Sequence, residues 1–282
     1  MTPAYKLGIK TLYKYRSLSE KQREHTLRLL AHDEIMLSSP RRFNDPFEAR
    51  PQVIFTDTNA AISEYVGKLI ANFRPGKTEE ENRTARQQLF RLVERDPRMA
   101  FEQALWTIVD DYGILSLTQD PAHPLMWSHY ADSHRGVCVE FNATQYFFPF
   151  AYEVRYQDDY PVVDPLVDSP PDTITKAIIT KATYWRYEKE FRVVMPKFSD
   201  EEKREHIAKV NKPVHKKMIE LHNGEGVYKI SPTALSGVIL GAKISKEDEK
   251  ELLGLIRARR PPISIRKAVL KPNAFGLDLV DY

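Results

Sequence analysis

The sequence predicts an α+β fold whose core is a mixed, largely antiparallel sheet. Strand-like segments outnumber helices in the second half of the chain, and the two kinds do not alternate regularly there, which argues against a doubly wound parallel sheet. A stretch of helical periodicity, about residues 59–112, separates the first strands from the rest. We therefore expect a single α+β domain over residues 1–282 that contains a helical insert.

The N-terminal segments predict a strand, a helix and a second strand. TLYKYR, residues 11–16, alternates in the manner of a strand, and Ser19 can begin a helix that contains periodic leucines. Residues 35–38 are predicted to form the second strand. FNDPF, residues 43–47, predicts an ordered turn, because Asn and Asp bond neighbouring backbone and proline restricts the residue before it.

The segments after the insert predict the rest of the sheet. Apolar or alternating runs bounded by turn residues indicate strands, and longer periodic runs indicate helices. Strands are predicted at 113–118, 137–141, 187–195, 218–221, 226–230, 237–240, 263–270 and 277–280, helices at 125–133, 173–185, 199–212 and 245–259, and a loop at 160–171.

Composition excludes several classes of protein. The one cysteine, Cys138, rules out an internal disulfide framework and a cysteine-based zinc cage, so we expect a reducing, cytoplasmic environment. No run approaches the ~18 apolar residues of a membrane span, and residues 1–15 lack the apolar core of a signal peptide. A net charge of +3 is too small to predict binding to duplex nucleic acid.

The best candidate for a catalytic element is the predicted strand around YEKEFRV, residues 187–193. Strand alternation places Glu188, Glu190 and Arg192 on one face. Two neighbouring carboxylates raise the pKa of one of them, whereas the arginine favours ionisation, and this mixture suits a site that stabilises developing positive charge. The alternative is an exposed sheet face with a surface ion pair.

The predicted helix at 125–133 supplies aromatic and polar side chains. Trp127, His129 and Tyr130 together suit stacking on a flat ring and bonding to its edge, although Trp127 alone also fits a core position. The spacing of His123, His129 and His134 does not match a helical metal-binding pair, so we expect no metal.

Further candidates lie on two predicted strands and one turn. Arg16 shares a strand face with Lys14 and suits a phosphate or ribose group, or else a surface acid. Ser116 and Thr118 share a face and offer two hydroxyls to a cleft, or bond the backbone. The expected cofactor contacts also include Tyr15 and Asn44.

Five motifs resemble the bacterial family catalogued as domain of unknown function 2971. The resemblance follows the order of that family over most of the chain, and the family's activity is poorly characterised. The motifs are LYKYRSL at 12–18, SSPRRFNDPFE at 38–48, LMWSHYADSHRGVCVEF at 125–141, YWRYEKEFRVV at 184–194 and VILGAKIS at 238–245.

A second, weaker resemblance is to ADP-ribosyltransferases, whose motifs are an early-strand cation, a Ser-x-Ser element and a late Glu-x-Glu. Arg16, Ser116-x-Thr118 and Glu188-x-Glu190 follow this order, although Thr118 replaces the second serine and the insert separates the first two motifs. The resemblance implies that Arg16 contacts the NAD backbone, Ser116 supports the nicotinamide half and Glu190 holds the ribose 2′-hydroxyl. Trp127 or Tyr130 would stack on nicotinamide.

The implied reaction is cleavage of the glycosidic bond to nicotinamide, with NAD as substrate and no metal. Glu190 would stabilise an oxocarbenium-like state, and Glu188 would position an unknown protein or nucleic-acid acceptor. If water replaced the acceptor, the enzyme would be an NAD glycohydrolase. A defence or toxin-type effector, restrained by an inhibitory or sensor partner, would suit that chemistry.

Two other functions also fit the sequence. Asp45-Pro46 with Glu190-x-Arg192 loosely resembles the metal site of a Mg-dependent nuclease, but the Asp-Pro order is reversed and an arginine stands in place of the usual lysine. Alternatively, the aromatic and polar motifs form a non-enzymatic pocket that binds a ligand or a protein.

Overall fold

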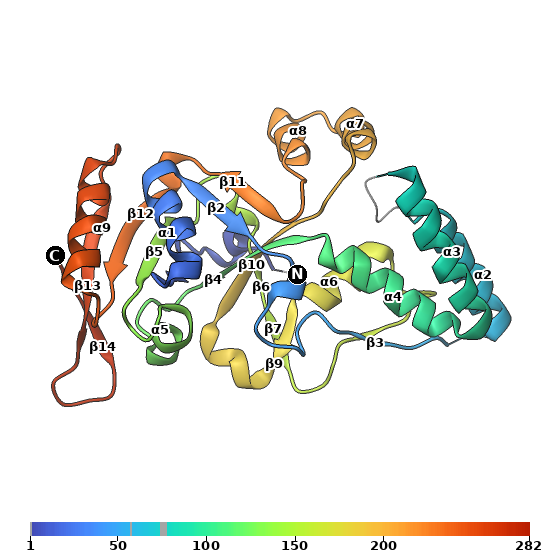
Figure 1. The fold of residues 1–282 in the computed structure, drawn as a ribbon, viewed down its shortest axis with the longest axis horizontal. Coiled ribbons are helices and arrows are strands. Elements are labelled where there is room, and N and C mark those ends of the chain that lie inside the picture. The colour runs from blue at the N-terminus through green and yellow to red at the C-terminus, as the bar shows by residue number, and fades with distance from the viewer. Residues whose placement is uncertain (1, 57, 74–77) are drawn as a thin grey trace.

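The computed structural model describes residues 2–56, 58–73 and 78–282, and it confirms the predicted α+β class (Figure 1). Within this part of the chain the main sheet has eight strands, and its only parallel pair is β12 with β13. Its spatial order is β14 (Leu277–Asp281), β13 (Ser264–Leu270), β12 (Leu235–Leu240), β5 (Val137–Asn142), β1 (Thr11–Arg16), β4 (Gly113–Thr118), β10 (Glu190–Met195) and β6 (Tyr152–Glu153).

Shorter strands pair in three small sheets around the main one. They are β2 (Glu34–Leu37) with β11 (Gly226–Lys229), β3 (Gln52–Val53) with β8 (Val162–Val163), and β7 (Arg155–Gln157) with β9 (Thr180–Ala182). The helices outside the insert include α1 (Glu20–His32), α5 (Pro124–Tyr130), α6 (Pro170–Ile178), α7 (Asp200–Lys209), α8 (Pro213–Glu220) and α9 (Lys246–Ala258). None of the described helices is long and apolar enough to cross a bilayer.

The predicted insert folds as α2 (Asn59–Ala71), α3 (Glu79–Arg95) and α4 (Pro97–Asp110), while residues 74–77 within it lie outside the described residues. Thr78 and Glu81 cap α3 reciprocally, and the Asp96 side chain caps α4 by accepting from the Met99 amide. The insert lies at one end of the molecule and β13, β14 and α9 lie at the other (Figure 1). The central strands lie between them.

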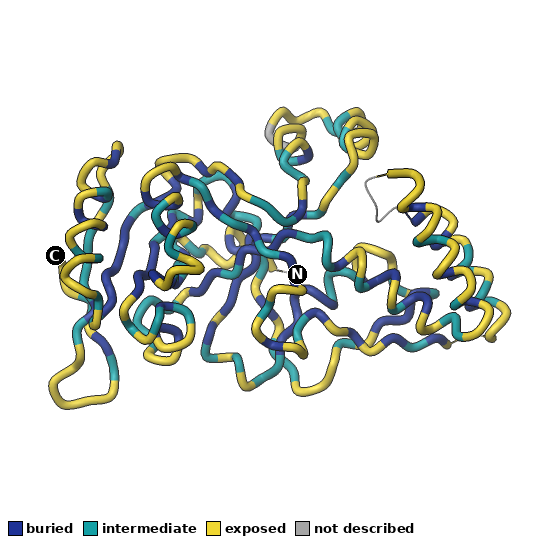
Figure 2. Tube along the Cα trace, viewed as in Figure 1, coloured by how far each residue is buried: buried dark blue, intermediate teal, exposed yellow. Residues whose placement is uncertain are grey.

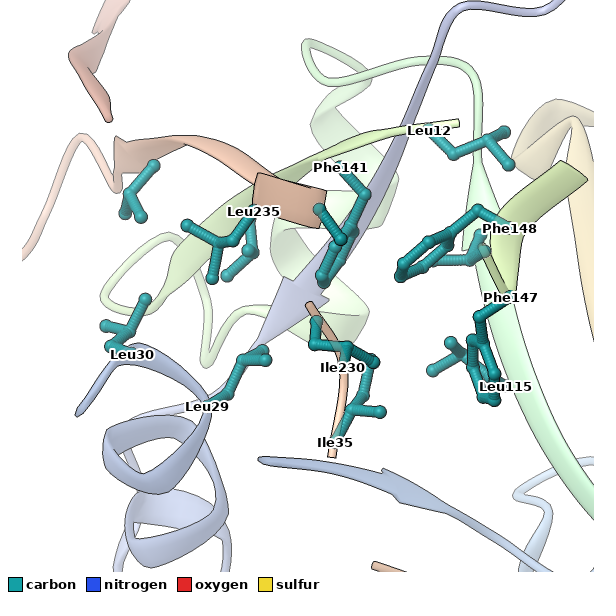
Figure 3. Packing of buried hydrophobic residues seen from close by; sticks show 14 of the residues in the cluster. Leu12, Leu29, Leu30, Ile35, Leu115, Phe141, Phe147, Phe148, Ile230 and Leu235 are labelled. Carbon is teal, nitrogen blue, oxygen red and sulfur yellow. The ribbon is translucent and has the colours of Figure 1, made fainter. Parts of the chain in front are cut away.

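The buried core follows these central strands, whereas the outer helices are largely exposed (Figure 2). On one face of the sheet, Leu29 and Leu30 of α1 face Leu235 and Phe141 of the sheet (Figure 3). On the opposite side a smaller cluster surrounds the fully buried Trp127. Packing on both faces holds β1, β4 and β10 in fixed register, which positions the side chains at their ends.

Three sequence predictions of secondary structure are wrong. Residues 183–188 form a short 3-10 helix, η4, which Lys189 caps in the left-handed region (φ 44°), so the predicted strand at 187–195 begins only at Glu190. The predicted helix at 173–185 ends at Ile178, where a run of β-branched residues leads into β9. The predicted strand at 218–221 belongs to α8, because a short apolar run does not distinguish the two structures.

Candidate active site

Neighbouring strands bring the predicted polar residues together. β10 pairs with β4 so that Glu190 lies opposite Thr118 and Arg192 opposite Ser116, and β1 pairs with the other edge of β4. A cavity of about 330 Å³ opens at this place. The predicted site residues that line it are Tyr15, Asn44, Ser116, Thr118, His129, Tyr130, Glu188 and Glu190. Its lining also includes residues outside the predicted catalytic and cofactor contacts, among them Lys14, Arg42, Phe43, Glu48, Lys181 and Arg192.

Glu188 reaches the cavity from the end of η4 rather than from the strand. Its side chain is buried and accepts two short hydrogen bonds, from the Tyr130 hydroxyl to Oε1 at 2.6 Å and from Lys181 Nζ to Oε2 at 2.6 Å. Thr118 Oγ1 donates to the Glu188 carbonyl oxygen at 2.5 Å. These three contacts fix the backbone and the carboxylate of Glu188, which lies outside the hydrogen-bonded strand β10.

Glu190 and Arg192 share a face of β10, as the strand alternation predicts. Arg192 Nε donates to Glu190 Oε1 at 2.7 Å and Nη2 donates to Oε2 at 2.9 Å, in a bidentate ion pair. Arg192 is 0% exposed, and its Nη1 donates to the Ile178 carbonyl oxygen at 2.5 Å. The predicted alternative of an exposed sheet face is wrong, because both faces of this strand are buried.

Lys181 and Glu48 complete the charged network, and the sequence analysis missed both as site residues. Lys181 Nζ lies 2.9 Å from Glu48 Oε1 and 3.3 Å from Glu190 Oε2, in addition to its contact with Glu188. Glu48 also pairs with Arg192. Glu48 ends the SSPRRFNDPFE motif, and this position was the signal in the sequence that could have indicated it. No local pattern distinguished Lys181.

The two glutamates of the site have opposite pKa shifts. Burial raises the pKa of Glu188, the charge of Glu190 adds to the increase, and Lys181 opposes it. Burial also disfavours the charged form of Glu190, but Arg192 and Lys181 outweigh burial and hold its pKa well below the ordinary value. Carboxyl groups whose environments push their pKa values apart are typical of acid and base pairs in active sites.

Lys14 and Arg16 extend from one face of β1, and neither forms an ion pair with a carboxylate in the described part of the chain. Lys14 lines the cavity and donates to the Ser116 carbonyl oxygen at 2.9 Å. Burial and the charge of Arg16 lower the pKa of Lys14 to about 7. The Nε atom of Arg16 is buried without a hydrogen-bond partner, and burial lowers the pKa of Arg16 to about 10. The charge of Glu190 opposes this decrease for Lys14 without forming an ion pair with it. Two basic side chains without an ion-pair partner favour an anionic ligand.

Two predicted contacts lie away from the cavity surface. Trp127 is 0% exposed, its indole N–H donates to the Pro121 carbonyl oxygen at 2.9 Å, and its ring packs edge-on against Tyr15. Trp127 therefore occupies a core position, one of the two alternatives that the sequence left open. Arg16 does not line the cavity, and Lys14 takes the place on β1 nearest to it.

The carboxylates of the nuclease alternative have other partners. Asp45 accepts the Trp185 indole N–H at 2.6 Å and the Phe47 amide at 2.9 Å, and it does not line this cavity. Glu190 is paired with Arg192. Over residues 2–56, 58–73 and 78–282, no group of three or more His, Cys, Asp or Glu side chains is arranged to hold a metal ion.

Comparison of the chain with protein families, with curated proteins and with solved structures finds no match. The two resemblances described above stay predictions.

Proposed function

We propose that the cavity binds NAD and cleaves the bond between nicotinamide and ribose, on an ADP-ribosyltransferase-like fold. The observation that supports this function best is the combination of Glu188 and Glu190, whose pKa values shift in opposite directions, with Lys14, a cation without a carboxylate partner, in one cavity. Glycosidic cleavage of a dinucleotide needs a fixed negative charge at the ribose and a positive charge at the pyrophosphate.

Binding would use the two sides of the cavity differently. Lys14, with Arg16 behind it, would hold the pyrophosphate, because an anion there supplies the missing counter-charge. His129 and Tyr130, on α5, both line the cavity and offer rings to the nicotinamide. The cavity of about 330 Å³ falls in the range of small-molecule sites and would hold the reacting half of the dinucleotide.

In the reaction, the bond between ribose C1′ and the nicotinamide nitrogen breaks, and its electron pair leaves with neutral nicotinamide. Glu190, kept ionised by Arg192, would stabilise the oxocarbenium-like ribose. Its bidentate ion pair also prevents it from rotating away. Water attacks C1′ and loses a proton to Glu188, whose raised pKa suits a general base. The products are ADP-ribose, nicotinamide and one proton.

An acceptor in place of water would make the same site an ADP-ribosyltransferase, in which Glu188 takes the proton of the acceptor. Consumption of cytoplasmic NAD would harm the cell that makes the enzyme. A role as a defence or toxin-type effector, restrained by an inhibitory or sensor partner, is therefore part of the proposal.

The test is incubation of the protein with NAD in the presence and absence of a chelator. Chromatography measures the nicotinamide that is released. We expect chelator-resistant release that falls by about 10²-fold or more in Glu190→Gln. Glu153→Gln is the matched control, because Glu153 lies on β6 opposite Phe191 of β10 and outside the cavity. Circular dichroism verifies that each variant is folded.

Three results would contradict the proposal. Cleavage of nucleic acid that needs Mg²⁺, without loss of NAD, would favour the nuclease alternative. Binding of NAD without release of nicotinamide would favour a ligand-binding module. Equal loss of activity in Glu190→Gln and Glu153→Gln would show that the glutamate acts through stability alone.

A further inference from the structure

A second cavity, of about 210 Å³, lies beside the first, and Glu48 and Lys181 line both. The ion pair between these two side chains, 2.9 Å long, therefore forms a wall that the cavities share. The second cavity is otherwise built from the turn that contains Phe47, from the end of β7 and the segment after it, from β9, and from Tyr184 of η4.

Three aromatic rings line the second cavity and stay accessible to solvent. Phe47 is 56% exposed, Tyr160 is 44% exposed and Tyr184 is 63% exposed. Large aromatic rings usually bury most of their surface, and several exposed rings around a concave site are typical of a surface that binds a ligand or a partner.

Negative charge predominates among the lining groups that have no ion-pair partner. Asp158 and Asp159 line it, and neither forms an ion pair in the described part of the chain. Of the two cations in the lining, Lys181 is surrounded by three carboxylates. Arg50 forms no ion pair in the described part of the chain, but its guanidinium is engaged over the Trp106 ring at 5.3 Å.

We propose that the second cavity binds a guanidinium group. A guanidinium is planar and weakly hydrated, so it can stack on Tyr160 or Tyr184 while its N–H groups donate to the free carboxylates. The volume of about 210 Å³ admits one extended side chain rather than a nucleotide. This site does not depend on cleavage of NAD, because none of its free groups takes part in that reaction.

The test is calorimetric titration of the full chain with agmatine, which presents a guanidinium on a short alkyl stem. We expect saturable binding that weakens about three- to tenfold in Tyr184→Ala, as loss of a cation–π contact predicts. Phe275→Ala is the matched control, because Phe275 is 110% exposed in the turn between β13 and β14. Asp158→Asn combined with Asp159→Asn should weaken binding and reduce its salt dependence.

A short peptide with one internal arginine distinguishes the two sources of this group. Tighter binding of the peptide than of agmatine indicates an arginine of a protein partner, and the reverse order indicates a free small molecule. Both orders support the guanidinium site. The proposal is overturned if agmatine gives no saturable signal, if putrescine binds equally well through its ammonium groups, or if Phe275→Ala weakens binding as much as Tyr184→Ala. The titration does not measure nicotinamide release, so a negative result for the guanidinium site does not bear on the proposed NAD reaction.

Discussion

Lys181 Nζ lies 2.6 Å from the Glu188 carboxylate, and this contact joins two consecutive elements of different structure. Lys181 lies on β9, outside the main sheet, whereas Glu188 ends η4. The same ammonium contacts Glu48 and Glu190. Burial opposes the charged form of Lys181, but these carboxylates outweigh it and raise its pKa. Lys181 is thus the central counter-charge of the site.

Lys181→Met should destabilise the protein by about 3–5 kcal/mol, because it leaves buried carboxylates without their shared cation. Urea unfolding near neutral pH measures this loss. Adding Glu188→Gln should recover part of it. Lys176→Met is the control, because its ion pair with Asp168 is partly exposed and should contribute at most about 1 kcal/mol. Equal losses in the two single variants would contradict the assigned role of Lys181.

Acid should remove the stabilisation that comes from Glu190. Its pKa is lower in the folded protein than the ordinary value of 4.5, so the folded state binds its proton less readily than the unfolded state does. The stabilisation by Glu190 is fully present above the pKa that this carboxyl has in the unfolded chain. It is lost as the pH falls through the pKa of Glu190 in the folded protein. The difference in unfolding free energy between the wild type and Glu190→Gln should therefore shrink below about pH 4.

Urea titrations at several pH values measure that difference. A gap between the two proteins that stays constant as the pH falls would show that the Glu190 carboxylate is not held ionised by Arg192. Glu153→Gln, on the neighbouring strand, should show no such dependence.

Local patterns predicted the strands of the site but not its charged network. TLYKYR and GILSLT fold as β1 and β4 with the predicted bounds, because apolar alternation and flanking turn residues specify strands locally. The pairing of β4 with β10 then places Ser116 and Thr118 beside Glu190. The local patterns contained no information about this pairing, whereas the resemblance to ADP-ribosyltransferases implied one site for Ser116 and Glu190.

The positions of Glu188, Lys181 and Glu48 depend on long-range contacts. Glu188 leaves the predicted strand because Lys189 adopts a left-handed conformation, which lysine rarely does. Lys181 belongs to a three-residue strand within a predicted helix, and Glu48 reaches Arg192 from a turn far away in sequence. No periodic pattern encodes such contacts, so the sequence predicted the proposed catalytic glutamates but missed two of the groups that set their charge.

Lys14→Met should stabilise the protein more at about pH 6 than at about pH 9. The pKa of Lys14 falls from the ordinary 10.5 to about 7 in the folded state, so the unfolded state binds more protons between these values. The stability of the wild type therefore rises as the pH increases from about 7 to 10.5. Below about pH 7 the folded protein bears the full cost of the buried Lys14 charge. The gain at the lower pH should exceed that at the higher pH by about 1–3 kcal/mol.

Urea unfolding at the two pH values checks this prediction. Lys10→Met, just before β1, is the control and should show no comparable pH dependence. Pyrophosphate should reduce the advantage of Lys14→Met at low pH, because an anion bound beside Lys14 stabilises the wild type alone. A gain that does not change with pH would contradict the lowered pKa of Lys14.

Tyr130→Phe should separate the structural role of the Tyr130 hydroxyl from its effect on Glu188. The hydroxyl donates to Glu188 Oε1 at 2.6 Å, and this bond helps to lower the pKa of Glu188 against burial. Its loss should cost about 1–3 kcal/mol of stability and raise the pKa of Glu188 further. In the proposed reaction Glu188 acts in its ionised form, so the acidic limb of the pH profile of nicotinamide release should move to higher pH. Tyr5→Phe, at a ring that is 54% exposed, should change neither quantity. A loss of stability with an unshifted pH profile would mean that Tyr130 only supports the fold and that Glu188 is not the base.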